Sequence, residues 1–238
     1  MAGHSKWANI KRRKEKVDAK RGKIFSRVAK EIITAVKQGG SGDPKSNPRL
    51  KVAIEKAKEV NFPQENIDRN IKKASSTDQG EYFDLTYEIY GHGGVGIVVE
   101  ILTDNKNRTS SDMRIATNKR GGNVATPGSV LFQFERKGVI RIPLSSIGEE
   151  ALFTSALDCG VDEIEQGDDE WILFTAVDDL LEVKKALIDK GLQVTEAEFE
   201  QIPKTFVDVD EENRKKNDDL VEWIENLDDV DAVFTNMG

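Results

Sequence analysis

The sequence has few of the residues on which several common kinds of protein depend. Its single cysteine, Cys159, cannot form an internal disulfide, and only His4 and His92 accompany it as soft zinc ligands. A disulfide scaffold and a structural zinc module are therefore excluded, and we expect neither a metal nor a cofactor. No apolar run approaches the roughly 20 residues that a bilayer span needs, and no apolar segment follows the basic N-terminus. We therefore expect a soluble cytoplasmic protein without a membrane partner.

Charged residues are abundant but unevenly distributed, although the net charge is only -8. Residues 1–73 hold 20 Lys and Arg against 8 Asp and Glu, residues 74–143 hold 8 of each, and residues 144–238 hold 7 against 27. Such polarity along one chain predicts an electrostatic partner for the basic end, and a phosphate backbone fits this role. The acidic end is expected to repel the same partner and so to orient the molecule.

Apolar residues at helical spacing predict a small helical module over residues 23–74. Phe25, Val28, Ile32 and Val36 fall on one face, and Gly39-Gly40 ends that helix. Asn47 followed by Pro48 is typical of an N-cap with proline at the first helical position, and Pro63 opens a third helix. We expect the basic segment ahead of this module to be loose on its own, because it lacks an apolar stripe.

The period changes from about 3.6 to 2 after the polar linker at 75–81, which indicates strands at 85–90 and 95–101. Thr109 to Asp112 resembles a capping box that opens a helix ending at Gly121-Gly122, and a further strand is predicted at 130–134. Residues 139–200 then predict the order βαββαβ, which is the split βαβ arrangement of ferredoxin-like domains.

The C-terminal segment 204–238 supplies a strand, a helix capped by Asp210 and a last strand, which complete the unit begun at 95–135. We therefore predict an α+β fold, an N-terminal helical module followed by two ferredoxin-like α/β sandwich domains, the third inserted in the second. The predicted domains are 1–78, 79–136 plus 204–238, and 137–203. A separate C-terminal pair of helix and strand is the alternative.

Two features that resemble catalytic sites have simpler interpretations. Gly91, Gly93 and Gly96 match the GxGxxG spacing, but a β-branched run follows them where a dinucleotide site needs a helix. These glycines fit a hairpin turn better. Cys159 is in step with the apolar side of a predicted helix, which favours a core position. We therefore expect that the chain is not an enzyme.

The basic arm, residues 1–30, is the strongest candidate for a functional site. It holds 11 Lys and Arg against Glu15 and Asp18. Binding along a polyanion would release condensed counterions, and Trp7 could stack on a base. The alternative is a solubilising tail. The predicted nucleic-acid-binding residues are Lys6, Trp7, Lys11, Arg12, Arg13, Lys14, Lys16, Lys20, Arg21, Lys23, Arg27 and Lys30. Lys72, Lys73, Arg108, Arg114, Lys119 and Arg120 are weaker candidates for extending this path.

Several sequence stretches closely resemble the YebC/PmpR family, whose eukaryotic relatives are mitochondrial translational activators of cytochrome oxidase. They include MAGHSKWANIKRRK, DAKRGKIFSR, GDPKSNPRLKVAIEKAK, NRTSSDMR, GGNVATPGSV and FERKG, so the resemblance covers essentially the whole chain. It implies three domains, helical first and α/β afterwards. Arg12 stands where a histidine is common and His92 where a proline is common. The absence of a presequence before the opening motif favours a bacterial member.

The resemblance implies one of two roles in gene expression. Members have been described as DNA-binding transcriptional regulators, and others look like ribosome-associated translation factors that relieve stalling, for example at proline runs. We predict a non-enzymatic nucleic-acid-binding regulator, with DNA or ribosomal RNA as the partner and the oligomeric state left open. Two further hypotheses are an enzyme with a cleft between the α/β domains and a pure protein-interaction scaffold, and neither explains the basic arm.

Overall fold

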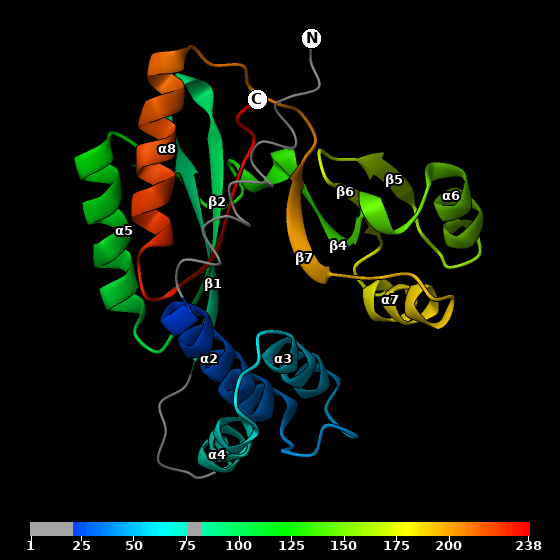
Figure 1. Ribbon diagram of the computed structural model, residues 1–238. Helices are drawn as coiled ribbons and strands as arrows, with labels where there is room; N and C mark the ends of the chain where they lie inside the picture. The colour runs from blue at the N-terminus through cyan, green and yellow to red at the C-terminus, as the bar shows by residue number, and fades with distance from the viewer. Residues whose placement is uncertain (1–20, 76–81) are drawn as a thin grey trace. The chain divides into compact units, whose positions relative to one another are not determined.

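The structure is a computed structural model that describes residues 21–75 and 82–238, with side chains from residue 24 onward. The chain divides into two compact units (Figure 1). One contains residues 131–206, and the other contains the described residues up to 130 together with 207–237. The first unit is thus an insertion in the chain of the second. The predicted α+β fold with an inserted α/β domain is confirmed, and each unit is described by itself below.

The helical module consists of three helices packed around one core. They are α2 (Arg21–Gly39), α3 (Pro48–Glu59) and α4 (Gln64–Ala74). The predicted stripe on the first helix is buried, as Val28, Ile32 and Val36 are at most 6% exposed, and it packs against Leu50 and Ile67. Burial of these side chains stabilises the module by the usual apolar transfer.

Asn47 fixes the approach of α3 to α2 and is itself buried. Its side-chain oxygen accepts a hydrogen bond from the Leu50 amide at 3.0 Å, which confirms the predicted N-cap. Its side-chain amide donates to the carbonyls of Ala35 and Ser41, each at 2.8 Å. One residue therefore caps α3 and ties it to the end of α2.

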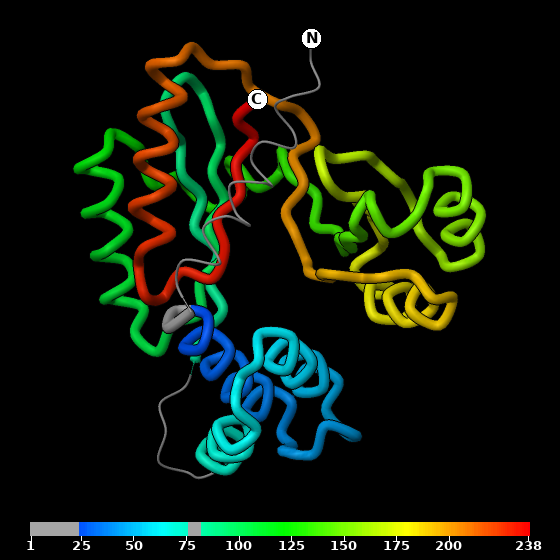
Figure 2. The backbone as a smooth tube through the Cα atoms, in the orientation of Figure 1, coloured from blue at the N-terminus to red at the C-terminus, as the bar shows by residue number. Residues whose placement is uncertain are grey.

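The α/β part of the same unit is a four-stranded antiparallel sheet in the order β3-β1-β2-β8. Its strands are β1 (Phe83–Tyr90), β2 (Gly96–Thr103), β3 (Asn123–Val124) and β8 (Val230–Thr235). Two helices, α5 (Lys106–Arg120) and α8 (Glu211–Glu225), lie side by side over one face. Figure 2 shows how the chain returns through α8 and β8 to the sheet begun by β1 and β2. The sheet is antiparallel with two helices on one face, but the β1–β2 hairpin lies in its middle, so its strand order is not the ferredoxin-like one. The chain order is ββαβ followed by αβ, and the βαββαβ order predicted for this domain is wrong.

The stretch 91–96, which holds the GxGxxG match, contains the turn between β1 and β2. Gly93 and Gly94 have φ of 69° and 84°, which glycine adopts without strain. The turn includes a short 3₁₀ segment (His92–Gly94), and β2 follows it directly. Buried Asn217 of α8 holds this turn by accepting from the His92 amide at 2.7 Å and donating to its carbonyl. The hairpin interpretation is confirmed.

The inserted unit contains the predicted βαββαβ series. Its elements are β4 (Phe134–Pro143), α6 (Glu149–Leu157), β5 (Glu163–Gln166), β6 (Glu170–Thr175), α7 (Leu180–Asp189) and β7 (Glu196–Pro203), with 3₁₀ turns at Leu131–Gln133 and Leu144–Ser146. The antiparallel order β5-β6-β4-β7 is ferredoxin-like. Both helices pack on one sheet face, where Cys159 is also buried as predicted.

A buried arginine occupies the other face of that sheet. The side chain of Arg141 on β4 is 4% exposed and forms ion pairs with three carboxylates. The distances are 3.2 Å to Glu170, 3.0 Å to Glu196 and 2.6 Å to Glu200. Burial opposes its charge, but these carboxylates outweigh burial and raise the pKa of Arg141 above its ordinary value.

Two predicted boundaries in the α/β region are wrong. Residues 130–134 do not form a strand: Leu131–Gln133 is a 3₁₀ turn, and the strand that follows α5 is the two-residue β3. Val130 and Phe134 are buried and Phe132 is exposed, and the boundary between the two units falls between residues 130 and 131. The helix α5 begins at Lys106 with Asn105 as its N-cap, and Thr109 serves a different purpose described below.

Candidate nucleic-acid interface

Most of the predicted arm lies outside the described residues. This applies to Lys6, Trp7, Lys11, Arg12, Arg13, Lys14, Lys16 and Lys20. Arg21 and Lys23 belong to the first turn of α2, in the part of that helix whose side chains are not described. Only Arg27 and Lys30 can be placed in atomic detail. The assignment of the arm to nucleic acid therefore stays a prediction.

Arg27 and Lys30 both pair with acidic residues near the start of β8. The guanidinium of Arg27 forms an ion pair with Asp231. The ammonium of Lys30 donates to the Asp229 carboxylate at 3.0 Å and to the backbone carbonyl of Asp228 at 2.9 Å. These two cations therefore join α2 to the α/β part of their unit. Sequence reasoning did not anticipate this, because the partners lie about 200 residues further along the chain.

Asp229 is the centre of a larger polar cluster between α2, β2 and α5. Its side chain is 5% exposed, and Arg108 donates to both of its oxygens, at 2.9 and 2.7 Å. The hydroxyls of Thr103 and Thr109, both buried, lie 3.0 Å from one of these oxygens. Burial alone would raise the pKa of Asp229, but hydrogen bonds from Arg108, Lys30 and Thr109 outweigh it and lower the pKa.

This cluster changes the interpretation of one weaker candidate. Arg108 is engaged with Asp229 and with Asp104, so its ion pairs are within the protein.

Lys119 and Arg120 are exposed at the end of α5 and lie over the ring of Trp223, at 5.4 and 4.8 Å from its centroid. Arg120 and Trp223 also line an open hollow of about 540 Å³ beside α8. Two of its other lining residues are acidic, so the hollow is unsuited to phosphate.

The helical module presents further exposed cations, and all but one of them were not singled out from the sequence. Several of its lysines and arginines are exposed on α3, on α4 or in the loop before α3, and the only signal for them was the local charge excess. They are Lys45, Lys51, Lys58, Arg69 and Lys72, of which only Lys72 was considered. Arg49 and Lys56 instead form ion pairs, with Asp84 and Glu31.

The described residues contain no arrangement that indicates metal or membrane chemistry. Within residues 21–75 and 82–238, no three His, Cys, Asp or Glu side chains are grouped to hold a metal ion. Over the same residues, no helix has the length and apolar character of a membrane span. The thiol of Cys159 donates to the Ser155 carbonyl at 3.1 Å in the core of the inserted unit.

Two protein-family profiles together match almost the whole chain. The family profile described as TACO1/YebC protein N-terminal domain matches residues 5–77, and that described as TACO1/YebC second and third domain matches residues 82–237. The chain belongs to the TACO1/YebC family. This confirms the resemblance drawn from the opening motif and the stretches after it.

Relatives within this family match along their whole length. A probable transcriptional regulatory protein of Protochlamydia amoebophila is 59% identical over all of this chain and 96% of its own. One of Chlamydia muridarum is 57% identical over the full length of both. The crystal structure of a conserved hypothetical protein from Aquifex aeolicus has a TM-score of 0.85 and 40% identity, covering 93% of this chain and 92% of its own.

Proposed function

We propose that this TACO1/YebC protein is a non-enzymatic, cytoplasmic regulator of gene expression that binds nucleic acid through its basic arm and helical module. The observation that carries the proposal is the excess of cations in residues 1–73, which contain 20 Lys and Arg but only 8 Asp and Glu. Exposed cations on α3 and α4 continue that excess into the described structure. The names of the relatives, probable transcriptional regulatory proteins, support a regulatory role.

The interaction would rest on phosphate contacts. Lysine and arginine side chains that replace condensed counterions gain affinity from counterion release, and this affinity falls steeply with salt. Such contacts position a protein on its partner without reading sequence, because phosphates are alike along the strand. The acidic residues of 144–238 would be repelled by the same backbone and would keep that part of the chain away from it.

Neutralising the arm tests this proposal. The variant Lys11→Gln, Arg12→Gln, Arg13→Gln, Lys14→Gln removes four cations from the segment that is richest in them. We expect weaker binding to a labelled duplex or RNA, and a slope of log K against log salt that is less negative by about 3 to 4 if all four touch phosphates. Fluorescence anisotropy titrations across a salt series measure both quantities.

A matched control removes four cations from the acidic half of the chain. It is Lys184→Gln, Lys185→Gln, Arg214→Gln, Lys215→Gln, which changes the net charge by the same amount. We expect its affinity and salt slope to stay near those of the unchanged protein. Equal losses in the two variants would show that net charge and not the arm governs binding, and the proposal would fail.

A ribosome-associated translation factor is the second candidate. The same cations would hold ribosomal RNA as well as DNA, since phosphate contacts do not distinguish the two. Ultraviolet crosslinking in cells, followed by sequencing of the attached nucleic acid, separates the candidates. Enrichment of promoter DNA supports a transcriptional regulator, and enrichment of ribosomal RNA supports the translation factor.

A further inference from the structure

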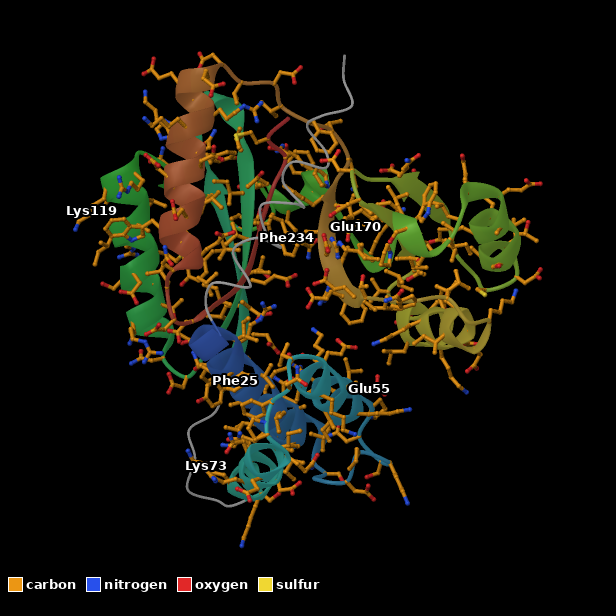
Figure 3. The ribbon with its side chains drawn as sticks, in the orientation of Figure 1. Phe25, Glu55, Lys73, Lys119, Glu170 and Phe234 are labelled. Atoms are coloured by element: carbon orange, nitrogen blue, oxygen red, sulfur yellow. The ribbon has the colours of Figure 1, made fainter. Side chains whose placement is uncertain are left out.

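One face of the sheet β3-β1-β2-β8 is buried, although its side chains belong to none of the three hydrophobic cores found among residues 21–75 and 82–238. Side chains alternate along each strand, so the residues between those that meet α5 and α8 point to the opposite face. On this face Val98, Leu102, Ala232 and Phe234 are 0, 6, 6 and 7% exposed. None of them belongs to the core that α5 and α8 cover, nor to the other two cores. Figure 3 shows Phe234 on the side of the sheet away from α5, where Lys119 is labelled.

Carboxylates are interleaved with these apolar side chains. Glu100 pairs in register with Ala232, and Glu88 pairs in register with Val98. Glu88 accepts hydrogen bonds from the amides of Val130 and Gly128 at one edge of this face. Glu100 is half-buried near its middle. The face thus combines apolar groups with negative charge, which fits a segment that has cations and a few large apolar residues.

The ion pairs of α2 hold this helix beside β8. Lys30 of α2 pairs with Asp229, and Arg27, one turn nearer the start of α2, pairs with Asp231. Going back along α2 from Lys30 to Arg27 therefore follows β8 in the direction of Phe234. The part of α2 around Arg27 and Lys30 therefore lies beside the start of β8. At about 3.3 Å per extended residue, residues 1–20 can span up to roughly 66 Å, more than the roughly 27 Å of an eight-residue strand.

The composition of residues 1–20 complements the face. They carry 7 Lys and Arg against Glu15 and Asp18, with Trp7, Ile10 and Val17 as the large apolar groups. Most of the cations come in one run at residues 11–16, between Ile10 and Val17. Apolar groups that flank cations can lie on Val98 and Phe234 while the cations meet Glu100.

We propose that residues 1–20 dock on this face of their own chain, and that docking withholds the arm from nucleic acid until a polyanion displaces it. Docking is argued from the sheet face and the arm alone, whereas the withholding of the arm from nucleic acid rests on the proposed function. The arm would then have two competing partners, an internal face with scattered carboxylates and an external strand of phosphates. Binding of nucleic acid would expose the apolar face as it removes the arm.

Site-specific photocrosslinking in the full-length protein tests docking without nucleic acid. A benzophenone amino acid is placed in turn at Trp7, Ile10 and Val17, with exposed Ile115 on α5 as the control position. We expect crosslinks from at least one arm position to peptides of β2 or β8, fewer of them at high salt, and none from Ile115. A mixture of light and isotope-labelled protein distinguishes a crosslink within one chain from one between two copies. Crosslinks only between copies, or none to β2 and β8 from any arm position, would overturn the proposal.

A charge change on the face tests the competition. Glu100→Gln removes the central carboxylate and keeps its shape, and Glu222→Gln on the exposed side of α8 is the matched control. We expect Glu100→Gln to tighten nucleic-acid binding about two- to fivefold at low salt, the effect of one partly screened ion pair, and Glu222→Gln to change it less. Equal affinities for both variants would overturn the withholding. If the protein bound no nucleic acid at all, the proposed function would fail while the crosslinks would still decide docking.

Discussion

The two units each contain a buried charge cluster, and the clusters are of opposite kinds. In the inserted unit, one cation, Arg141, is surrounded by three carboxylates from neighbouring strands. In the other unit, one carboxylate, Asp229, receives donors from Arg108 and Lys30 and lies against two threonine hydroxyls. The first cluster joins strands of one sheet, whereas the second joins α2, β2, α5 and the segment before β8.

How far each cluster stabilises the fold depends on whether the partners of its central residue can reach water. Glu170 and Glu200 are 10 and 5% exposed and could not reach water if Arg141 were lost. Arg108 is 46% exposed and could turn into solvent if Asp229 were lost. An uncompensated buried charge is costly, while an exposed one is nearly neutral. The Arg141 cluster should therefore be the more sensitive of the two, and the Asp229 cluster the one that couples distant segments.

The largest effect is expected for Arg141→Met. It leaves two buried carboxylates without their cation and should lower the free energy of unfolding of the inserted unit by about 3 to 5 kcal/mol. Denaturant unfolding followed by the fluorescence of Trp171, which is buried in the core of that unit, measures this. The triple variant Arg141→Met, Glu170→Met, Glu200→Met should recover most of the loss, since a whole apolar replacement leaves no unpaired charge. A single variant as stable as the triple one would contradict this explanation.

A smaller loss is expected for Asp229→Asn. The variant keeps the shape but weakens every hydrogen bond to Arg108 and Lys30, and should cost about 2 kcal/mol because charge-assisted bonds are lost. The neighbouring exposed Asp228→Asn is the control and should cost less than about 0.5 kcal/mol, since only its backbone carbonyl accepts from Lys30. Chemical denaturation of both variants checks the difference, and a loss larger than that of Arg141→Met would reverse the comparison.

The acid dependence of stability should also depend on Asp229. Its pKa in the folded protein is lowered below the unfolded value of about 3.9, so its contribution is complete above that value and disappears as the pH falls through the folded pKa. We expect Asp229→Asn to lose less stability than the unchanged protein between about pH 5 and pH 2. Unfolding free energies measured across that range test this, and parallel pH curves for the two proteins would argue against it.

The smallest effect is expected for Arg27→Gln. Arg27 and Asp231 are 28 and 29% exposed, and a partly solvated ion pair contributes about 0.5 kcal/mol. Asp231→Asn should have a similar effect, and the double variant little more, because both changes break the same pair. A double-mutant cycle on unfolding free energy measures the coupling. Additive losses would show that the two side chains stabilise the fold independently.

Much of the fold could be predicted from local signals. The N-caps at Asn47 and Asp210 and the helix end at Gly121 are short-range chemistry that reads directly from the sequence. The start of α5 could not be placed in this way. Thr109 looks like a cap but bonds to Asp229, a residue 120 positions away that no local pattern reveals. The alternation at 130–134 also misled, because Phe132 is 65% exposed and lies in a 3₁₀ turn instead of a strand.

The candidate site was predicted by charge composition and not by geometry. Composition identifies the basic region but cannot show which cations the fold uses internally. Arg27 and Lys30 have acidic partners that only the return of β8 brings near them. Lys51 and Lys58 were missed because the sequence does not distinguish them from other surface lysines. Their common exposure on α3 is evident only when the buried side of that helix is known.

Binding of nucleic acid by the unmodified full-length protein is the most direct test of the central claim. Fluorescence anisotropy with a labelled duplex of about 20 base pairs and with a ribosomal RNA fragment, each from about 20 to 200 mM salt, gives affinity and slope together. For about six phosphate contacts we predict binding at low salt with a slope of log K against log salt near -5 for at least one partner. Failure to bind either partner at the lowest salt, or binding that salt does not weaken, would contradict the account.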